Sequence, residues 1–307
     1  MSHVVRGNVS SASDLPSEAI QRLRRAAETL QLASAVLYAQ TSGAHLFQGI
    51  GRDDRVTAVK VLKAPNTDSD RRRRLVLLKR EARCLATSES RNTPRFVAVD
   101  EEGLWIAREF VAGQTLHAAR KSMDKAQRRA AVQRVAAMVR DIFPRFHAYT
   151  GGAHVIRDLK PRNIVLDSAA PRAVLVDLGA VAPEGTAARA QDSKVRLGTG
   201  KWRFWAPEQL VDAERVGREA DYFAFASTVF FIVTGRPVLQ NSASDVAIAT
   251  VAFHRDCQIA MNELRASDLA LSETFLDFLV SCLAVVPTGR PRNVDLLERA
   301  DVPFELS

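Results

Sequence analysis

One polar segment constrains this chain more than any other, because it holds charged residues at fixed spacing between apolar runs. The segment reads HVIRDLKPRNIVLD and spans residues 154–167. Lys160 comes two residues after Asp158, and Asn163 comes five residues after it. A following apolar run, VLVDLGA, carries Asp177 fourteen residues after Asn163, which is the spacing that a short β-hairpin between the two gives. Taken alone, the first segment can also be explained as a polar loop in which Asp, Lys and Asn occur by chance.

These motifs resemble those of the protein kinase family. The polar segment resembles the catalytic loop HRDLKxxN, and DLG at 177–179 resembles the metal-binding DFG element, with Leu178 in place of phenylalanine. Further family motifs follow in the same order along residues 33–300, so chance ceases to be a serious explanation. The resemblance implies an α+β, bilobal kinase fold, with a small lobe built on a five-stranded sheet with one helix and a larger, mainly helical lobe.

The resemblance gives each polar residue a role in phosphoryl transfer. Asp158 is expected to accept or orient the substrate hydroxyl proton, and Lys160 to neutralise charge that develops on the transferred group. Asn163 and Asp177 are expected to bind Mg²⁺, a hard cation that prefers oxygen ligands. Lys160 and the DLKP context resemble serine/threonine kinases more than tyrosine kinases.

Residues upstream of the polar segment are expected to hold ATP. TAVKV at 57–61 resembles the family's VAIK strand, so Lys60 would hold the α- and β-phosphates. Its expected partner is Glu81, which lies twenty-one residues further on in a predicted helix.

The adenine base is expected to bind backbone groups of a hinge at 109–112, which includes Glu109 and Val111. Apolar walls such as Ala58 and Val165 would enclose the base. Arg108 stands just before this hinge, at the gatekeeper position, where the family usually has an apolar or small polar residue.

Three residues near the C-terminal end match structural positions of the family. WAPEQ at 205–209 resembles the APE motif, which predicts an ion pair between Glu208 and Arg290. Asp221 resembles the aspartate that opens the central buried helix and bonds back to the catalytic-loop backbone.

The chain departs from the family pattern in its phosphate loop, where AQTSGAHL replaces GxGxxGxV and leaves only Gly43. Fewer glycines allow fewer backbone N–H groups to approach phosphates closely, which predicts weaker ATP binding or an altered loop.

The family's HRD histidine is Ile156, while Arg157 is kept. Arg157 is expected to bind a phosphate group carried by the activation segment, whose hydroxyls are Thr186, Ser193 and Thr199. Ser193 and Thr186 are the foremost candidates for that phosphorylation.

Hydrophobic periodicity predicts the elements that carry these motifs. We expect an N-terminal tail and helix over 1–32, the small lobe over 33–112 and the large lobe over 113–307. The helix begins near Ser13, Asp14 or Pro16, ends near Gln31 and packs on its own lobe. The remaining predictions are strands at 33–39, 44–50 and 55–62, a helix at about 70–87, a hairpin over 96–111 that turns at 101–103, short strands near 165 and 174–176, and a buried helix at 223–233.

Composition limits the setting in which such a chain works. Cys84, Cys257 and Cys282 form no CxxC pair, so a disulfide framework or zinc site is not indicated and a cytoplasmic location is expected. The longest strongly apolar run is too short for a membrane span, which needs about 20 residues. The formal net charge is +8, yet the basic run at 71–74 looks like one solvated helix face, so nucleic acid is not an expected partner. The sequence does not indicate an oligomeric state.

Three functions are compatible with the motifs. The first is an ATP- and Mg²⁺-dependent serine/threonine kinase of the eukaryotic-like bacterial kind, which acts on protein substrates and on itself. The second is a pseudokinase or nucleotide-binding scaffold, for which the altered phosphate loop is the argument. The third is a small-molecule phosphotransferase, a class that typically lacks the DLKP lysine, the APE element and the late arginine present here.

Overall fold

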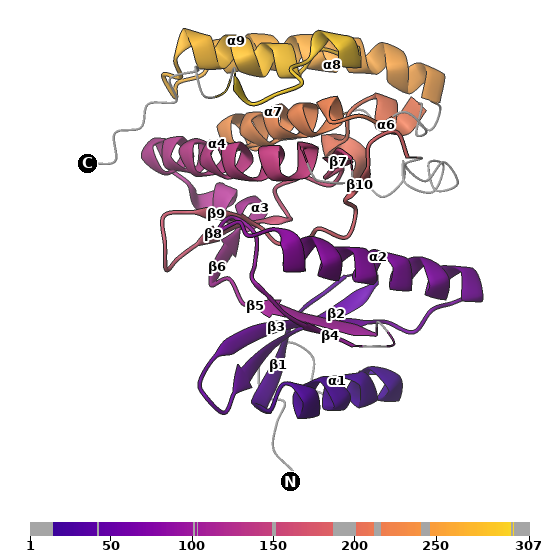
Figure 1. The fold of residues 1–307 in the computed structure, drawn as a ribbon. Coiled ribbons are helices and arrows are strands. Elements are labelled where there is room, and N and C mark those ends of the chain that lie inside the picture. Colours follow the sequence, from indigo (N-terminus) through magenta and orange to yellow (C-terminus); the bar gives the residue numbers. More distant parts are fainter. Residues whose placement is uncertain are drawn as a thin grey trace. The chain divides into compact units, whose positions relative to one another are not determined.

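The computed structural model describes residues 15–41, 43–100, 102, 104–148, 152–186, 201–211, 216–240, 246–295 and 297. The side chains of residues 201, 202, 211 and 246–251 are not described. The chain divides into two compact units, Met1–Val111 and Ala112–Ser307 (Figure 1).

Unit 1 contains a five-stranded antiparallel sheet with the strand order β1-β2-β3-β5-β4. Its strands are β1 Leu32–Gln40, β2 Ala44–Gly51, β3 Val56–Leu62, β4 Phe96–Val99 and β5 Trp105–Glu109. The register pairs Ala58 with Arg108 and Lys60 with Ile106. Because paired residues of antiparallel strands point to the same face, Lys60 and Arg108 share one face of the sheet.

Helix α1, Ser17–Thr29, packs on the opposite face of that sheet (Figure 1). Its Leu23 and Ala26 join a buried cluster with Phe47, Val59 and Trp105. The predicted N-terminal helix that packs on its own sheet is therefore confirmed. Two of the predicted start residues, Ser13 and Asp14, lie outside the described residues, and the N-cap is Pro16.

Helix α2, Asp68–Thr87, lies on the face that carries Lys60 (Figure 1). The Thr67 side chain accepts a hydrogen bond from the backbone N–H of Asp70 at 3.1 Å, so the helix begins two residues earlier than predicted. Leu78 and Glu81 are buried against the sheet, whereas 71–73 are exposed. Three arginines of the basic run are thus on the exposed helix face, as predicted, whereas Arg74 is half-buried and pairs with Asp70.

Unit 2 holds two small sheets that support the polar segment. Strands β6 Gly113–Thr115, β8 Ile164–Asp167 and β9 Ala173–Leu175 form one sheet in the order β6-β8-β9. Strand β7 His154–Val155 pairs with β10 Ala182–Pro183. The predicted short strands near 165 and 174–176 are confirmed, with β9 ending at Leu175.

Helix α7, Glu219–Thr234, is the centre of unit 2, since every residue from 219 to 233 is buried. It lies between α4, Lys125–His147, and the pair formed by α8, Val246–Arg265, and α9, Glu273–Cys282 (Figure 1). Most of its residues are apolar because neighbours cover every side of it. Among the residues that the structure describes, the other helical elements are short: α3 Leu116–Ala119, α6 Glu208–Val211, and 3₁₀ turns at Arg120–Ser122, Lys201–Phe204 and Pro287–Gly289.

The predicted fold class is confirmed, because one unit is a five-stranded sheet with its helices and the other is mainly helical. Strands β4 and β5 form the predicted hairpin, of whose turn Glu101 and Gly103 lie outside the described residues. Among the helices that the structure describes, each is too short or too polar to cross a lipid bilayer.

Candidate active site

The sequence-predicted site residues fall into two groups, one in each unit. Unit 1 contains Gly43, Ala58, Lys60, Glu81, Glu109 and Val111. Unit 2 contains Asp158, Lys160, Asn163 and Asp177.

In unit 1, Lys60 and Glu81 form a short, buried ion pair. Lys60 Nζ lies 2.6 Å from Glu81 Oε2, and the side chains are 17% and 1% exposed. Strand β3 places the lysine and helix α2 the glutamate, twenty-one residues apart in the chain. A buried ion pair of this kind fixes an ammonium group in one position, as a phosphate-binding lysine requires.

The proposed base-binding segment directly follows β5. The backbone N–H of Glu109 bonds the carbonyl of Arg95 at 2.8 Å, so this group is already in use. Val111 is buried, and within the described part of the chain no hydrogen bond to its backbone N–H is recorded. Ala58 is buried beside Arg108 on the Lys60 face of the sheet.

The altered phosphate loop is a tight turn between β1 and β2. Thr41 Oγ1 accepts hydrogen bonds from the backbone N–H groups of Gly43 and Ala44, at 3.3 and 3.0 Å. A Cβ on Gly43 would meet nothing within 4 Å, so nearby atoms do not require glycine there. A phosphate that binds these N–H groups must displace the threonine hydroxyl, which agrees with the expectation of an altered loop.

In unit 2, three residues of the polar segment meet around one carboxylate. Lys160 Nζ lies 2.6 and 2.7 Å from the two carboxylate oxygens of Asp158. Asn163 Nδ2 donates to Asp158 Oδ2 and to the Asp158 carbonyl, both at 2.9 Å. Both side chains of the Asp158–Lys160 pair remain partly exposed, at 22% and 16%. The carboxylate is thus oriented by two donors while it stays accessible.

Asn163 and Asp177 offer oxygen atoms that suit a hard divalent cation. Because Asn163 uses its amide nitrogen toward Asp158, its amide oxygen is left as an acceptor. The chain turns back through the antiparallel strands β8 and β9, so that Val176, just before Asp177, comes close to Asn163. The backbone N–H of Val176 donates a hydrogen bond to the Asn163 carbonyl at 2.8 Å. Among the described residues there is no group of three or more His, Cys, Asp or Glu side chains that could hold a metal by themselves. Mg²⁺ fits the donors present, since it usually takes one or two protein oxygens together with phosphates and waters.

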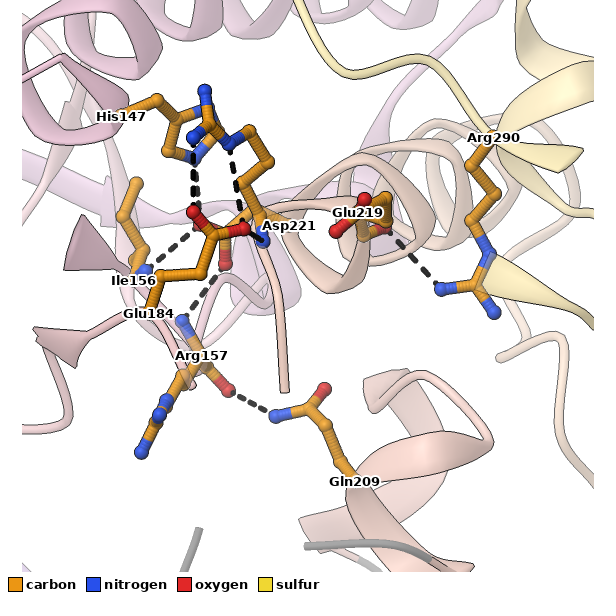
Figure 2. Close-up of polar contacts among 9 residues, drawn as sticks. His147, Ile156, Arg157, Glu184, Gln209, Glu219, Asp221 and Arg290 are labelled. Atoms are coloured by element: carbon orange, nitrogen blue, oxygen red, sulfur yellow. Dashed lines mark hydrogen bonds and ion pairs between the residues drawn. The ribbon is translucent and has the colours of Figure 1, made fainter. Parts of the chain in front are cut away.

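Asp221 anchors the backbone of the polar segment (Figure 2). Its carboxylate accepts the backbone N–H groups of Ile156 and Arg157, each at 2.8 Å, and it is fully buried. His147 Nε2 lies 2.9 Å from the same carboxylate. Ile156, which replaces the family histidine, is itself buried and is held through its backbone.

Arg157 adopts a backbone conformation that few residues other than glycine accept. Its φ is 67°, a left-handed value that typically costs about 1–3 kcal/mol. Asp221 holds its N–H, and Gln209 Nε2 donates to its carbonyl at 3.1 Å (Figure 2). Gln209 Oε1 also accepts the backbone N–H of Ala206 at 2.9 Å, so one amide joins the polar segment to the APE motif.

The Arg157 side chain points to the beginning of the activation segment. Its guanidinium donates to the Thr186 carbonyl at 2.6 Å and to Thr186 Oγ1 at 3.0 Å. Thr186 is thus the predicted phosphorylation candidate that the structure places at Arg157; Ser193 and Thr199 lie outside the described residues.

Glu184, two residues before Thr186, forms an ion pair. Glu184 lies 2.9 Å from Arg218. Burial raises the pKa of Glu184, but the hydrogen bonds and charge of Arg218 outweigh burial and keep that pKa below its usual value.

The predicted ion pair between Glu208 and Arg290 is present and bidentate, with distances of 2.7 and 2.9 Å. Arg290 also donates to the carbonyls of Ala284, Val285 and Glu219, the last of which Figure 2 shows. Its side chain is fully buried, and the guanidinium lies over the Phe223 ring, 5.0 Å from the centroid. Every role of this arginine is structural.

Two polar partners of the site were not found from the sequence. His147 is the last residue of α4, and Gln209 follows the APE glutamate directly. A histidine at a helix end and a glutamine after a motif are common surface residues, so neither carries a signal by itself. The motif position of Gln209 was the only available indication.

Comparison with known proteins agrees with this geometry. The family model described as "Protein kinase domain" matches residues 42–300. The chain is 32% identical over 209 residues to the serine/threonine-protein kinase PknF of Mycobacterium tuberculosis, which covers 64% of this chain and 40% of PknF. It is 29% identical over 168 residues to the serine/threonine-protein kinase AfsK of Streptomyces coelicolor, or 54% of this chain and 18% of AfsK. It is 25% identical over 223 residues to the serine/threonine-protein kinase sid1 of Schizosaccharomyces pombe, or 72% of this chain and 44% of sid1.

The chain therefore belongs to the protein kinase domain family. The resemblance to bacterial serine/threonine kinases that the sequence predicted is confirmed. Members of this family use ATP as a co-substrate, together with divalent metal ions, to phosphorylate protein acceptors. The chain spans less than half the length of each of these relatives.

Proposed function

We propose that this chain is an ATP-dependent serine/threonine protein kinase, which transfers the γ-phosphoryl group of ATP to protein hydroxyls, including its own. The observation that carries the proposal is the oriented carboxylate of Asp158. Lys160 and Asn163 bond it while it stays accessible, and Asp221 holds the loop that carries it.

In this proposal Asp158 orients the acceptor hydroxyl and takes its proton. Phosphoryl transfer needs positioning and charge stabilisation more than covalent chemistry, so a fixed carboxylate beside a fixed ammonium group suits the step. Lys160 neutralises charge on the transferred group, and Lys60, held by Glu81, neutralises charge on the α- and β-phosphates. Mg²⁺ held by Asn163 and Asp177 would supply further charge neutralisation for the phosphates.

Two features favour a protein acceptor over a small molecule. Lys160 contacts Asp158 directly, and Glu208 of the APE motif pairs with the buried Arg290. Small-molecule phosphotransferases typically lack both features. The chain keeps the polar residues of the family's catalytic machinery, which favours an active enzyme over a nucleotide-binding scaffold. These residues are Lys60, Glu81, Asp158, Lys160, Asn163 and Asp177.

The direct experiment is phosphate transfer by the purified chain. It is incubated with Mg²⁺ and γ-labelled ATP, with and without a generic basic protein acceptor, beside Asp158→Asn and Lys60→Met variants. Label on serine or threonine that both variants lose supports the proposal. ATP binding without any transfer indicates a scaffold, and label only on added small hydroxylated compounds indicates the third function.

Thr186 is our candidate for an activating phosphorylation. A phosphate on its hydroxyl would add charge-assisted hydrogen bonds to Arg157, whose guanidinium already contacts that hydroxyl. We expect phosphatase treatment to lower the specific activity and Thr186→Ala to prevent its recovery after incubation with ATP. Mass spectrometry that finds Thr186 unmodified in fully active protein overturns this assignment.

A further inference from the structure

Arg108 is a buried arginine on the Lys60 face of the unit 1 sheet. It is 6% exposed, and its Nε makes no hydrogen bond. Within the described part of the chain no ion pair is recorded for it. A buried donor without an acceptor is unfavourable, so a guanidinium whose Nε is buried and unbonded has donor capacity left for a further acceptor.

The surroundings of Arg108 indicate what that acceptor belongs to. The β3–β5 register puts its side chain on the face of the sheet that carries Lys60, directly beside Ala58. It immediately precedes Glu109, the first residue of the proposed base-binding segment. If a base binds the proposed segment, its edge would approach the Arg108 side chain, which shares a face of the sheet with the proposed phosphate-binding lysine.

An exposed aromatic ring lies in the same region. Tyr38 of β1 is 38% exposed and meets Phe110 edge to face, with 5.5 Å between the ring centroids. Burial raises the pKa of Tyr38, while the positive charges of Arg108 and Lys60 oppose that change. Tyr38 is thus close to both cations, and it offers a face on which a base can stack.

The chemistry of the two purines differs at the edge that an arginine reads. Guanine presents two adjacent acceptors there, O6 and N7, whereas adenine presents the N7 acceptor beside the N6 amino donor. Arginine has only donors and pairs with the guanine edge through two parallel hydrogen bonds. We propose that Arg108 reads the O6/N7 edge of guanine, so that this chain accepts GTP as a phosphoryl donor in addition to ATP.

This inference rests on the proposed function, because the hinge assignment places the base beside Arg108. The transfer step is otherwise the same. The bond between the γ-phosphorus and the β–γ bridging oxygen of GTP breaks, and a bond to the acceptor hydroxyl oxygen forms. GDP leaves, and the hydroxyl proton goes to Asp158.

The first test measures nucleotide binding without catalysis, by calorimetric titration of the full chain with ADP, GDP, IDP and 7-deaza-GDP in Mg²⁺ buffer. IDP keeps O6 and N7 but lacks the 2-amino group, so it should bind about as well as GDP. 7-Deaza-GDP lacks the N7 acceptor and should bind several-fold more weakly than GDP. IDP that binds at least tenfold more weakly than GDP overturns the O6/N7 assignment.

The second test asks whether Arg108 is responsible. In Arg108→Met, which keeps length but removes every donor, the ratio of Kd for GDP to Kd for ADP should rise by about tenfold or more, because a bidentate base contact gives roughly 1–3 kcal/mol of discrimination. Arg108→Lys keeps the charge without the planar fork and should recover only part of the ratio. Arg24→Met, which removes an exposed arginine of α1, is the matched control and should leave the ratio unchanged.

The outcomes separate this inference from the proposed function. Phosphate transfer from ATP but not GTP, with an unchanged ratio in Arg108→Met, overturns the guanine assignment alone. Absence of transfer from either nucleotide overturns the proposed function, while the diphosphate titrations still decide how Arg108 selects the base.

Discussion

At the scale of single residues, several side chains of the site act by holding the backbone in place, and the backbone of Arg157 is the clearest case. Its left-handed φ of 67° is kept because Asp221 holds its N–H and Gln209 holds its carbonyl. The position of Asp158, the next residue, therefore depends on these two hydrogen bonds to the backbone of Arg157. A small change at a supporting residue should therefore alter the rate of transfer more than the binding of nucleotide.

Gln209 offers the sharpest test of that reasoning. Gln209→Glu keeps an acceptor for the Ala206 N–H but removes the donor to the Arg157 carbonyl. We expect kcat to fall by about tenfold, because a lost hydrogen bond of roughly 1–1.5 kcal/mol loosens the carboxylate in the transition state. The nucleotide Kd should stay within about twofold. Gln209→Leu removes both bonds and should be worse. Equal losses in kcat and in nucleotide affinity would contradict a positioning role.

At the scale of elements, the apolar pattern predicted helices and strands well, because burial decides them locally. The β1–β5 sheet and the fully buried α7 follow directly from valine-rich alternation and from an all-apolar run. Ion pairs such as Lys60–Glu81 were predicted only through a family resemblance, since charged residues are common at the surface.

Contacts that join distant elements through ordinary residues were not predictable from the sequence. His147 reaches Asp221 from seventy-four residues away, and Gln209 reaches Arg157 across fifty-two. Neither partner has a periodic or compositional signal, because its importance arises only when the fold brings the two together.

The Arg290–Glu208 pair should stabilise unit 2 strongly. Because the arginine is fully buried, Arg290→Met leaves Glu208 without its partner and should lower the free energy of unfolding by about 3–5 kcal/mol. Urea denaturation measures this change. Adding Glu208→Leu removes the stranded charge, so the double variant should be more stable than Arg290→Met alone. A double variant whose losses simply add would show that the two residues do not interact.

The turn between β8 and β9 provides a pH-dependent prediction. Burial raises the pKa of Asp167, but hydrogen bonds from Arg172 and from the backbone of 169 outweigh it, so that pKa lies below its ordinary value. A depressed carboxylate pKa adds stability that is complete above the unfolded-state pKa of roughly 4 and is lost as the pH falls through the folded-state value.

Asp167→Asn should therefore be less stable than the parent chain at pH 7, by about 1–3 kcal/mol. The difference should shrink as the pH falls below roughly 4. Urea denaturation across pH 3–7 tests this, with Asp268→Asn at an exposed ion pair as the matched control. A difference that stays constant over the whole range would contradict the assigned charge contacts.

At the scale of the whole molecule, the proposed function draws on residues of both units. Unit 1 supplies a fixed lysine and the groups proposed to select the base; unit 2 supplies the oriented carboxylate and the proposed metal ligands. Effects on nucleotide affinity and effects on the rate of transfer should therefore be distinguishable. Variants in unit 1 should change mainly nucleotide affinity, and variants around Asp158 should change mainly the rate.

The most direct test of the central claim compares Asp158→Asn with the parent chain at saturating nucleotide, with kcat for transfer to a protein acceptor and Kd for nucleotide both measured. The account predicts that kcat falls by about 10² to 10⁴, because a general base and its electrostatic partner contribute on that order. The nucleotide Kd should remain within about threefold. A variant that keeps kcat within about threefold of the parent chain would contradict the assignment of Asp158, and with it the proposed mechanism.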